Sequence, residues 1–160
     1  MKRGLIAVVL LVVLAGLGYF AFSRNAAPDV SYRTLDGRVL TQASLRDKVV
    51  LVNFWATSCP GCVKEMPEMK KMYQTLAPQG LEIVAVAMSY DPPAYVKTYA
   101  EKNALPFPVA LDADGSVARA FGDVQLTPTT FLIGRDGKVL KRYVGVMDFA
   151  EVEHLIAQNL

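Results

Sequence analysis

One apolar run in the middle of the chain limits the folds open to it. Residues 49–56 read Val-Val-Leu-Val-Asn-Phe-Trp-Ala, with Asn53 as the single polar residue. Such a run is typical of a strand that is covered on both faces, because a strand with one wet face alternates apolar and polar residues. Strands of this kind belong to sheets that carry helices on both sides. The run therefore predicts the central strand of an α/β domain.

The segments around this strand alternate as such a domain requires. Apolar or β-branched runs predict further strands, and helical spacing predicts helices between them. The strands are expected at 81–88, 107–111, 129–133 and 139–144, and the helices at 60–76, 92–103, 116–121 and 149–159. Asp36-Gly37 predicts a β-hairpin between 30–35 and 39–40, followed by a helical turn within 41–46. This order indicates an α/β sandwich with a mixed sheet.

The first residues differ in character from the rest of the chain. Lys2 and Arg3 precede an uncharged stretch from Gly4 to Phe22, which is about the length of a membrane-spanning helix. This length favours an uncleaved anchor over a signal peptide, although small residues near 21–27 leave cleavage open. The positive charge on the first flank predicts a cytoplasmic amino terminus and an exported remainder.

We expect an anchor at 1–25, a linker at 26–29 and one domain at 30–160, which is enough chain for a single core. A content of 52% hydrophobic and 20% charged residues, with a net charge of +2, is typical of a folded domain with an added apolar segment. The 17 basic and 15 acidic residues are dispersed along the chain, with no basic run interleaved with aromatic residues. Nucleic-acid binding is therefore not expected.

The only two cysteines, Cys59 and Cys62, lie where the central strand ends and the next helix begins. Unpaired N–H groups and the positive end of the helix dipole face Cys59 and favour its thiolate. In such positions the pKa of a cysteine falls from about 8.5 to between about 3.5 and 7.5. Pro60 suits the first helical position, where its missing N–H is not needed. We predict that Cys59 is the nucleophile and Cys62 the resolving thiol.

Three other roles for the cysteine pair are less well supported. A structural disulfide closing four residues removes only about 1.9 kcal/mol of unfolded-state entropy, against about 4.7 kcal/mol for a loop of about one hundred. Zinc requires four ligands, but there is no second cysteine pair and His154 lies in the last predicted helix. Covalent haem requires a histidine directly after Cys62, where the chain has Val63. We expect no metal and no cofactor besides the redox-active disulfide Cys59-Cys62.

The stretch Phe54-Trp55-Ala56-Thr57-Ser58-Cys59-Pro60-Gly61-Cys62, with Pro67 five residues on, resembles the active-site segment of the thioredoxin superfamily. Further motifs resemble the TlpA/ResA/CcmG-like branch over roughly residues 30–158. They are Lys64-Glu65-Met66-Pro67, the hairpin before the motif, the extra strand and helix within 81–104, and Thr127-Pro128-Thr129-Thr130-Phe131-Leu132-Ile133.

This resemblance implies a thioredoxin-like fold and protein-disulfide reductase activity. Members of the branch are exported, usually tethered, and mostly reduce disulfides in partner proteins, including apocytochromes c and copper-handling proteins. It therefore implies a monomer on the periplasmic side of a bacterial inner membrane, with disulfide-containing exported proteins as substrates. A membrane electron donor of the thiol-reducing type would recharge it.

The resemblance also assigns roles around the cysteines. Pro128 matches the family's cis-proline beside the active-site sulfurs, which implies that the Thr127 backbone is free to pair with a substrate peptide. The alternative is an ordinary trans proline at the start of a strand. Phe54 and Trp55 are expected to pack in the core, and Trp55 is also a candidate to line the cysteine site and bind substrate.

The sequence departs from the thioredoxin pattern at two places. Typical thioredoxins carry a buried aspartate where this chain has Asn53, and the branch that it resembles often uses a nearby glutamate instead, which here is Glu65. We hypothesise that Glu65 tunes or shuttles the proton of Cys62 or Cys59, the alternative being a solvated surface carboxylate. The second departure is Ser58, where an aromatic residue usually precedes the first cysteine, so the rim of the site should be more open.

Two other functions use the same thiols. A strongly stabilised thiolate also suits a thiol oxidant, and the reduction potential decides between the two directions. A copper metallochaperone is the other, but copper-handling relatives generally need a longer cysteine spacing and a nearby histidine. Met66, Met69 and Met72 lie at three-residue spacing, and we interpret them as a core stripe rather than a copper site. A peroxidase is not favoured, because the usual proline and threonine ahead of a lone cysteine are absent.

Overall fold

A computed structural model of the chain describes residues 25–160. The predicted anchor therefore lies outside the described residues, apart from its last residue. Within the described part, no helix has both the length and the apolar character needed to cross a membrane. The predicted strands and helices of the domain all occur, with some ends shifted by one or two residues.

The strands are β1 (Ser31–Arg33), β2 (Val39–Thr41), β3 (Val49–Trp55), β4 (Leu81–Ala87), β5 (Val109–Leu111), β6 (Thr129–Ile133) and β7 (Val139–Val144). The helices are α2 (Pro60–Leu76), α3 (Pro93–Lys102), α4 (Ser116–Ala120) and α5 (Phe149–Ala157), with 3₁₀ turns at Ala43–Leu45 and Ala77–Gln79. β1 and β2 form the predicted hairpin, and Gly37 takes a positive φ of 84° in its turn. Glycine adopts that conformation without steric cost.

The main sheet is mixed and has the order β5-β4-β3-β6-β7. β3 lies at its centre, parallel to β4 and antiparallel to β6, and all its residues are buried. This confirms the interpretation of residues 49–56 as a strand covered on both faces. The sheet needs both parallel and antiparallel pairing because β6 returns along β3 after the α4 segment, and β7 then follows as a hairpin strand.

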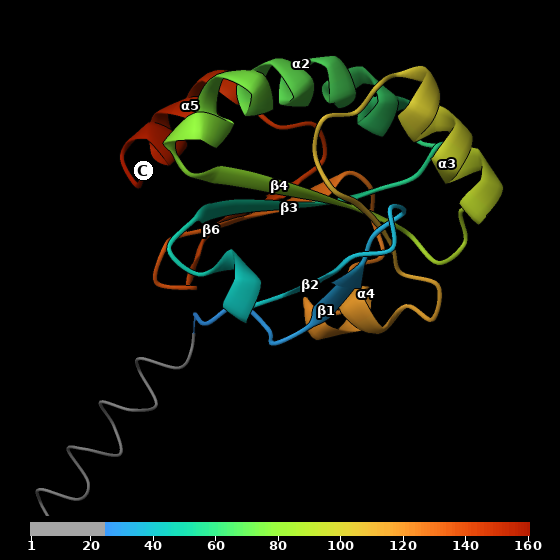
Figure 1. Cartoon of the computed structure of the whole chain (residues 1–160), viewed down its shortest axis with the longest axis horizontal. Helices are drawn as coiled ribbons and strands as arrows, with labels where there is room; N and C mark the ends of the chain where they lie inside the picture. The colour runs from blue at the N-terminus through green and yellow to red at the C-terminus, as the bar shows by residue number, and fades with distance from the viewer. Residues whose placement is uncertain (1–24) are drawn as a thin grey trace, which may run out of the picture.

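The two faces of the sheet are covered by different elements (Figure 1). α2, α3 and α5 lie on one face, and the β1-β2 hairpin and α4 lie on the other. Residues of β3 alternate between the two cores: Leu51 and Trp55 face α2, whereas Val52 and Phe54 face the hairpin side. The methionines of α2 are buried in the first core, which confirms that they form a core stripe: Met66, Met69 and Met72.

The first described residues attach to the domain at the end of the sheet away from the cysteines. Val139 donates a backbone hydrogen bond of 2.7 Å to Asn25, and Ala27 donates one of 2.8 Å to Gly137. Residues 25–27 therefore pair with the β6-β7 hairpin, although the sequence placed 26–29 in a linker. Because β6 runs antiparallel to β3, this hairpin lies at the end of the sheet where β3 begins. The cysteines follow the other end of β3, where α2 begins.

Candidate functional site

Cys59 and Cys62 form a disulfide at the amino end of α2. Cys59 is the residue that caps the helix, and Pro60 follows at a first-turn position. The backbone N–H of Cys62 donates to Cys59 Sγ over 3.2 Å, so one of the helix's unpaired donors is already directed at this sulfur. Cys59 is half-buried, whereas Cys62 is fully buried behind it. An attacking group can therefore reach Cys59 more readily than Cys62.

The same geometry gives the reduced site its polarity. In the described disulfide, Cys59 Sγ accepts from the N–H of Cys62 and lies at the positive end of a helix that runs to Leu76, an environment that favours a negative charge on this sulfur. Cys62 is packed in the apolar core with Met66 and Trp55, where no charge is stabilised. The two sulfurs therefore differ in environment as nucleophile and resolving thiol must.

The Thr127-Pro128 peptide bond is cis, which confirms the predicted cis-proline. Pro128 lies against the disulfide loop: a methyl group built on Gly61 would be 3.4 Å from Pro128 Cδ and 3.2 Å from Val146 Cγ2. Gly145 donates a backbone hydrogen bond of 2.8 Å to the Pro128 carbonyl, which ties the residues after β7 to this loop. Within residues 25–160, the Thr127 backbone N–H and C=O have no backbone partner, so they are available to an added strand.

Glu65 lies one helical turn after Cys62 and its side chain is only 1% exposed. The alternative of a solvated surface carboxylate is therefore wrong. Oε1 accepts a hydrogen bond of 2.6 Å from the backbone N–H of Met147, and Oε2 has no hydrogen-bond partner in the described part of the chain. Burial raises the pKa of Glu65, while the Met147 hydrogen bond and the Asn53 side chain lower it in part. Desolvation is the largest of these effects, so the net shift of the Glu65 pKa is upward.

Asn53 lies on the α2 side of β3 and donates a hydrogen bond of 2.8 Å from Nδ2 to Thr130 Oγ1 on β6. Its Oδ1 is buried and has no donor within the described residues. Asn53 and Glu65 therefore each present a buried oxygen without a donor.

Trp55 is fully buried and packs against Tyr99 of α3, with ring centroids 5.2 Å apart. It shares a hydrophobic cluster with Cys62, as a residue beneath the cysteine site would, but it has no surface that a substrate could touch. Its candidate role in substrate binding is corrected for this reason. The strand geometry explains the outcome: side chains of β3 alternate between two covered faces, and Trp55 lies on the face that α2 and α3 cover, whereas Phe54 lies on the other.

Sequence reasoning missed one acidic residue beside the site. Asp91 follows β4 and is 5% exposed, and both of its carboxylate oxygens accept hydrogen bonds from Thr57. Oδ2 accepts from the Thr57 N–H at 2.6 Å, and Oδ1 accepts from the hydroxyl at 2.6 Å. Asp91 thereby holds the segment that leads from β3 to Cys59. The only local signal was the Asp91-Pro92-Pro93 sequence, which reads as an ordinary helix start.

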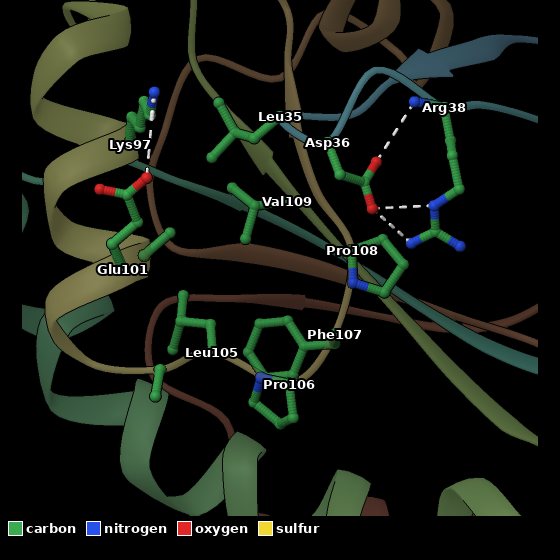
Figure 2. A pocket seen from close by; sticks show the side chains of 12 residues that line it. Leu35, Asp36, Arg38, Lys97, Glu101, Leu105, Pro106, Phe107, Pro108 and Val109 are labelled. Carbon is green, nitrogen blue, oxygen red and sulfur yellow. Dashed lines mark hydrogen bonds and ion pairs between the residues drawn. The ribbon is translucent and has the colours of Figure 1, made fainter.

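A surface pocket of about 430 Å³ lies between the β1-β2 hairpin, α3 and residues 104–109, and neither cysteine lines it (Figure 2). Its floor is apolar, and its rim carries two ion pairs, Asp36 with Arg38 at 2.7 Å and Lys97 with Glu101 at 3.9 Å. Opposite charges neutralise one another at both places, so the pocket offers no net charge to an ionic ligand. No group of three or more potential metal-ligating side chains is found within residues 25–160.

Comparisons with known proteins place this site in a family. Residues 23–156 match the Redoxin family. The chain is 38% identical over 160 residues to the thiol-disulfide oxidoreductase ResA of Geobacillus thermodenitrificans, covering 92% of this chain and 91% of that protein. It is 36% identical over 150 residues to ResA of Bacillus subtilis, covering 87% and 83%.

Solved structures agree with this placement. A putative thioredoxin from Neisseria meningitidis superposes with a TM-score of 0.79 at 41% identity, over 84% of this chain and 89% of that one. A thiol:disulfide interchange protein from Chlorobium tepidum superposes with a TM-score of 0.77 at 31% identity, over 84% and 95%. With its paired cysteines at the start of α2, the chain thus belongs to the Redoxin family, among the thiol-disulfide oxidoreductases that resemble ResA.

Proposed function

We propose that this oxidoreductase acts as a dithiol reductase of disulfides in exported proteins. The observation that carries the proposal is the difference in exposure between its two cysteines. Cys59 is accessible at the amino end of α2, and Cys62 is buried one turn further along the helix. An accessible thiolate can attack a substrate disulfide, and a buried neighbouring thiol can then resolve the mixed disulfide within the same molecule. The relatives named as thiol-disulfide oxidoreductases support the same class of reaction.

The proposed reaction transfers two electrons in two exchange steps. The Cys59 thiolate attacks one sulfur of the substrate disulfide, forms a mixed disulfide and releases the other substrate sulfur, which takes up a proton. Cys62 then loses its proton and attacks Cys59 Sγ, which closes the Cys59-Cys62 disulfide and releases the second substrate thiol. The substrate gains two electrons and two protons, and the enzyme is left oxidised as in the described structure.

The second step requires a group that removes a proton from a buried thiol. Glu65 is suited to this because it lies one turn from Cys62, is buried, and has a raised pKa. Its Oε2 has no other partner in the described residues, so it is open to a proton. We assign Glu65 as the proton acceptor for Cys62, returning the proton to the departing thiolate. Asn53 has no titratable group and therefore does not take up this proton.

Substrate recognition is proposed to use the cis-proline loop. An extended substrate segment would pair with the free peptide groups of Thr127 as a short added strand, with Pro128 holding it beside the disulfide loop. Main-chain hydrogen bonds of this kind bind any extended segment, and therefore permit several protein substrates.

The proposed location is the periplasmic side of a bacterial inner membrane, with residues 1–25 as the anchor. The apolar stretch from Gly4 to Phe22 supports this location. Residues 25–27 join the domain at the end of the sheet opposite to the disulfide. An anchor attached there would leave the cysteines facing away from the membrane. A membrane-embedded thiol donor would then recharge the pair, and apocytochromes c or copper-site proteins are the proposed substrates.

Equilibration of the full chain with a series of thiol-disulfide buffers tests the direction. A reduction potential near that of thioredoxin, about −270 mV, is expected for a reductase, whereas a value near about −120 mV would assign the chain as an oxidant. Rapid reduction of a protein disulfide by the dithiol form, and no oxidation of reduced substrates by the disulfide form, would agree with the reductase assignment.

A further inference from the structure

An exposed tyrosine lies directly beside the proposed peptide-binding loop. Tyr90 stands in the turn between β4 and α3, and 57% of its surface is exposed. Its hydroxyl lies 3.3 Å from Thr127 Oγ1, the residue that precedes the cis-proline. Its neighbour Asp91 is hydrogen-bonded to Thr57, two residues before Cys59. Tyr90 is thus linked to the cis-proline loop through its own hydroxyl, and to the segment that leads to Cys59 through its neighbour Asp91.

Two other apolar side chains are exposed around the same loop. Leu126, next to Thr127 in the chain, is 67% exposed, and Val146, which lies against Gly61 of the disulfide loop, is 52% exposed. Single exposed apolar residues are common on proteins, but a group of them around a reactive centre marks a surface that contacts a partner. We call Tyr90, Leu126 and Val146 the rim.

The rim also bears on Ser58. The side chain before the first cysteine is small and exposed, so it offers no ring to a substrate. Thr57, the residue before Ser58, is hydrogen-bonded to Asp91, the residue after Tyr90, so the β4-α3 turn lies next to the segment that leads to Cys59. The one aromatic side chain of the rim therefore comes from the β4-α3 turn.

We propose that Tyr90 is a specificity-determining residue: its ring contacts the substrate residue next to the attacked cysteine and favours an apolar side chain there. A segment paired with Thr127 runs past the Tyr90 hydroxyl, because that hydroxyl touches the Thr127 side chain. A tyrosine ring presents a large apolar face and loses little conformational entropy on contact, since it has only two side-chain torsions. This inference rests on the proposed function, since it concerns the substrate of that reaction.

Three substrates and three variants test it. The substrates are two disulfide-bonded peptides that differ only in leucine or serine before the attacked cysteine, and bis(2-hydroxyethyl) disulfide, which is too small to reach the rim. The variants are Tyr90→Ala, Tyr90→Phe and Tyr95→Ala. Tyr95 is a matched control because it is 65% exposed on the neighbouring helix and has no hydrogen bond to the proline loop. Rates are measured with the dithiol form of the full chain.

For Tyr90→Ala we expect kcat/KM to fall about tenfold with the leucine peptide and by less than about twofold with the serine peptide. Tyr90→Phe should remain within about twofold of wild type on both peptides, because the ring is kept, and Tyr95→Ala should match wild type. The small disulfide should react equally with all four proteins.

Equal losses on both peptides, or no loss on either, would overturn the inference. A loss with the small disulfide would also overturn it, since Tyr90 would then act through the structure of the loop. Failure of the proposed function gives a different result: the wild-type dithiol form would then reduce none of the three substrates.

Discussion

The Glu65 carboxylate accepts a hydrogen bond of 2.6 Å from the backbone N–H of Met147, which lies 82 residues further along the chain. This contact joins α2 to the segment between β7 and α5, and it holds a carboxylate in the core one turn from Cys62. A charge in that position has lost its water and has recovered only part of the loss through hydrogen bonds. Glu65 is therefore where pH should act most directly on this protein.

The Glu65→Gln variant should remove one component of the pH dependence of stability. Because burial raises the pKa of Glu65 above its ordinary value of 4.5, the folded protein binds a proton that the unfolded chain has already released. The stability that this proton confers is fully present below about pH 4.5 and is lost as pH rises through the raised pKa. Urea unfolding at successive pH values should show this fall in wild type and not in Glu65→Gln.

Glu68→Gln is the matched control, since Glu68 lies on the same helix but is exposed and paired with Lys71. That variant should retain the pH dependence of wild type. In catalysis, Glu65→Gln should slow closure of the Cys59-Cys62 disulfide and flatten its pH profile, with attack by Cys59 less affected. Parallel stability curves for wild type and Glu65→Gln would show that folding does not sense the Glu65 charge.

Cys62→Ala should accumulate a mixed disulfide on Cys59. The accessible sulfur can still attack a substrate, but the buried sulfur that releases the product is gone. Mass spectrometry of the non-reduced adduct identifies the captured protein. Cys59→Ala is the control and should capture nothing, because Cys62 is fully buried. Equal capture by the two variants would contradict the assignment of Cys59 as the nucleophile and Cys62 as the resolving thiol.

Asp91→Ala should destabilise the protein by about 1–3 kcal/mol, since it removes both acceptors of Thr57 and leaves the donors without partners. Asp91→Asn keeps one carbonyl oxygen and should lose less. Denaturant unfolding of the oxidised proteins measures the difference, and Asp29→Ala, at an exposed position, serves as control. If Asp91→Ala unfolds at the wild-type midpoint, the hydrogen bonds to Thr57 add nothing to stability.

Gly61→Ala should separate substrate binding from stability. The added methyl would come within 3.2 Å of Val146 and 3.4 Å of Pro128, and exposed Val146 can yield to it. Because Gly61 does not have a positive φ, alanine can adopt its conformation and loses less backbone entropy on folding, which favours alanine by about 0.4–1 kcal/mol. We expect unchanged or slightly higher stability, slower reduction of protein substrates and an unchanged rate with bis(2-hydroxyethyl) disulfide. A comparable slowing with the small disulfide would mean that the methyl disturbs the cysteines themselves.

The order of strands and helices could be predicted because it depends on local patterns. The continuous apolar character of residues 49–56 requires burial on both faces, and β3 is the central strand. Likewise Asp36-Gly37 determines a turn through the conformation of its own glycine, which has a φ of 84°. The spacing of Cys59 and Cys62 at a strand-helix junction predicted the reactive pair for the same reason, because the helix end supplies its own donors.

The residues that surround the pair could not be predicted in this way. Trp55 was expected at the substrate surface as well as in the core, and only the placement of α3 shows it covered by Tyr99. For Asp91, the local sequence indicates a helix start, and its bonds to Thr57 cross 34 residues. The Tyr90 contact with Thr127 crosses 37 residues and depends on the positions of two loops at once.

Local sequence by itself thus determined the elements and the cysteine pair, because each of these depends on neighbours within one strand, turn or helix, whereas the cis-proline was expected from the family resemblance of Thr127-Pro128. The tertiary structure alone decided that Glu65 is buried and that Tyr90 stands beside Thr127. The physical reason is desolvation and contact between distant segments: whether a carboxylate loses its water, or a ring meets a loop, depends on what the fold packs against it.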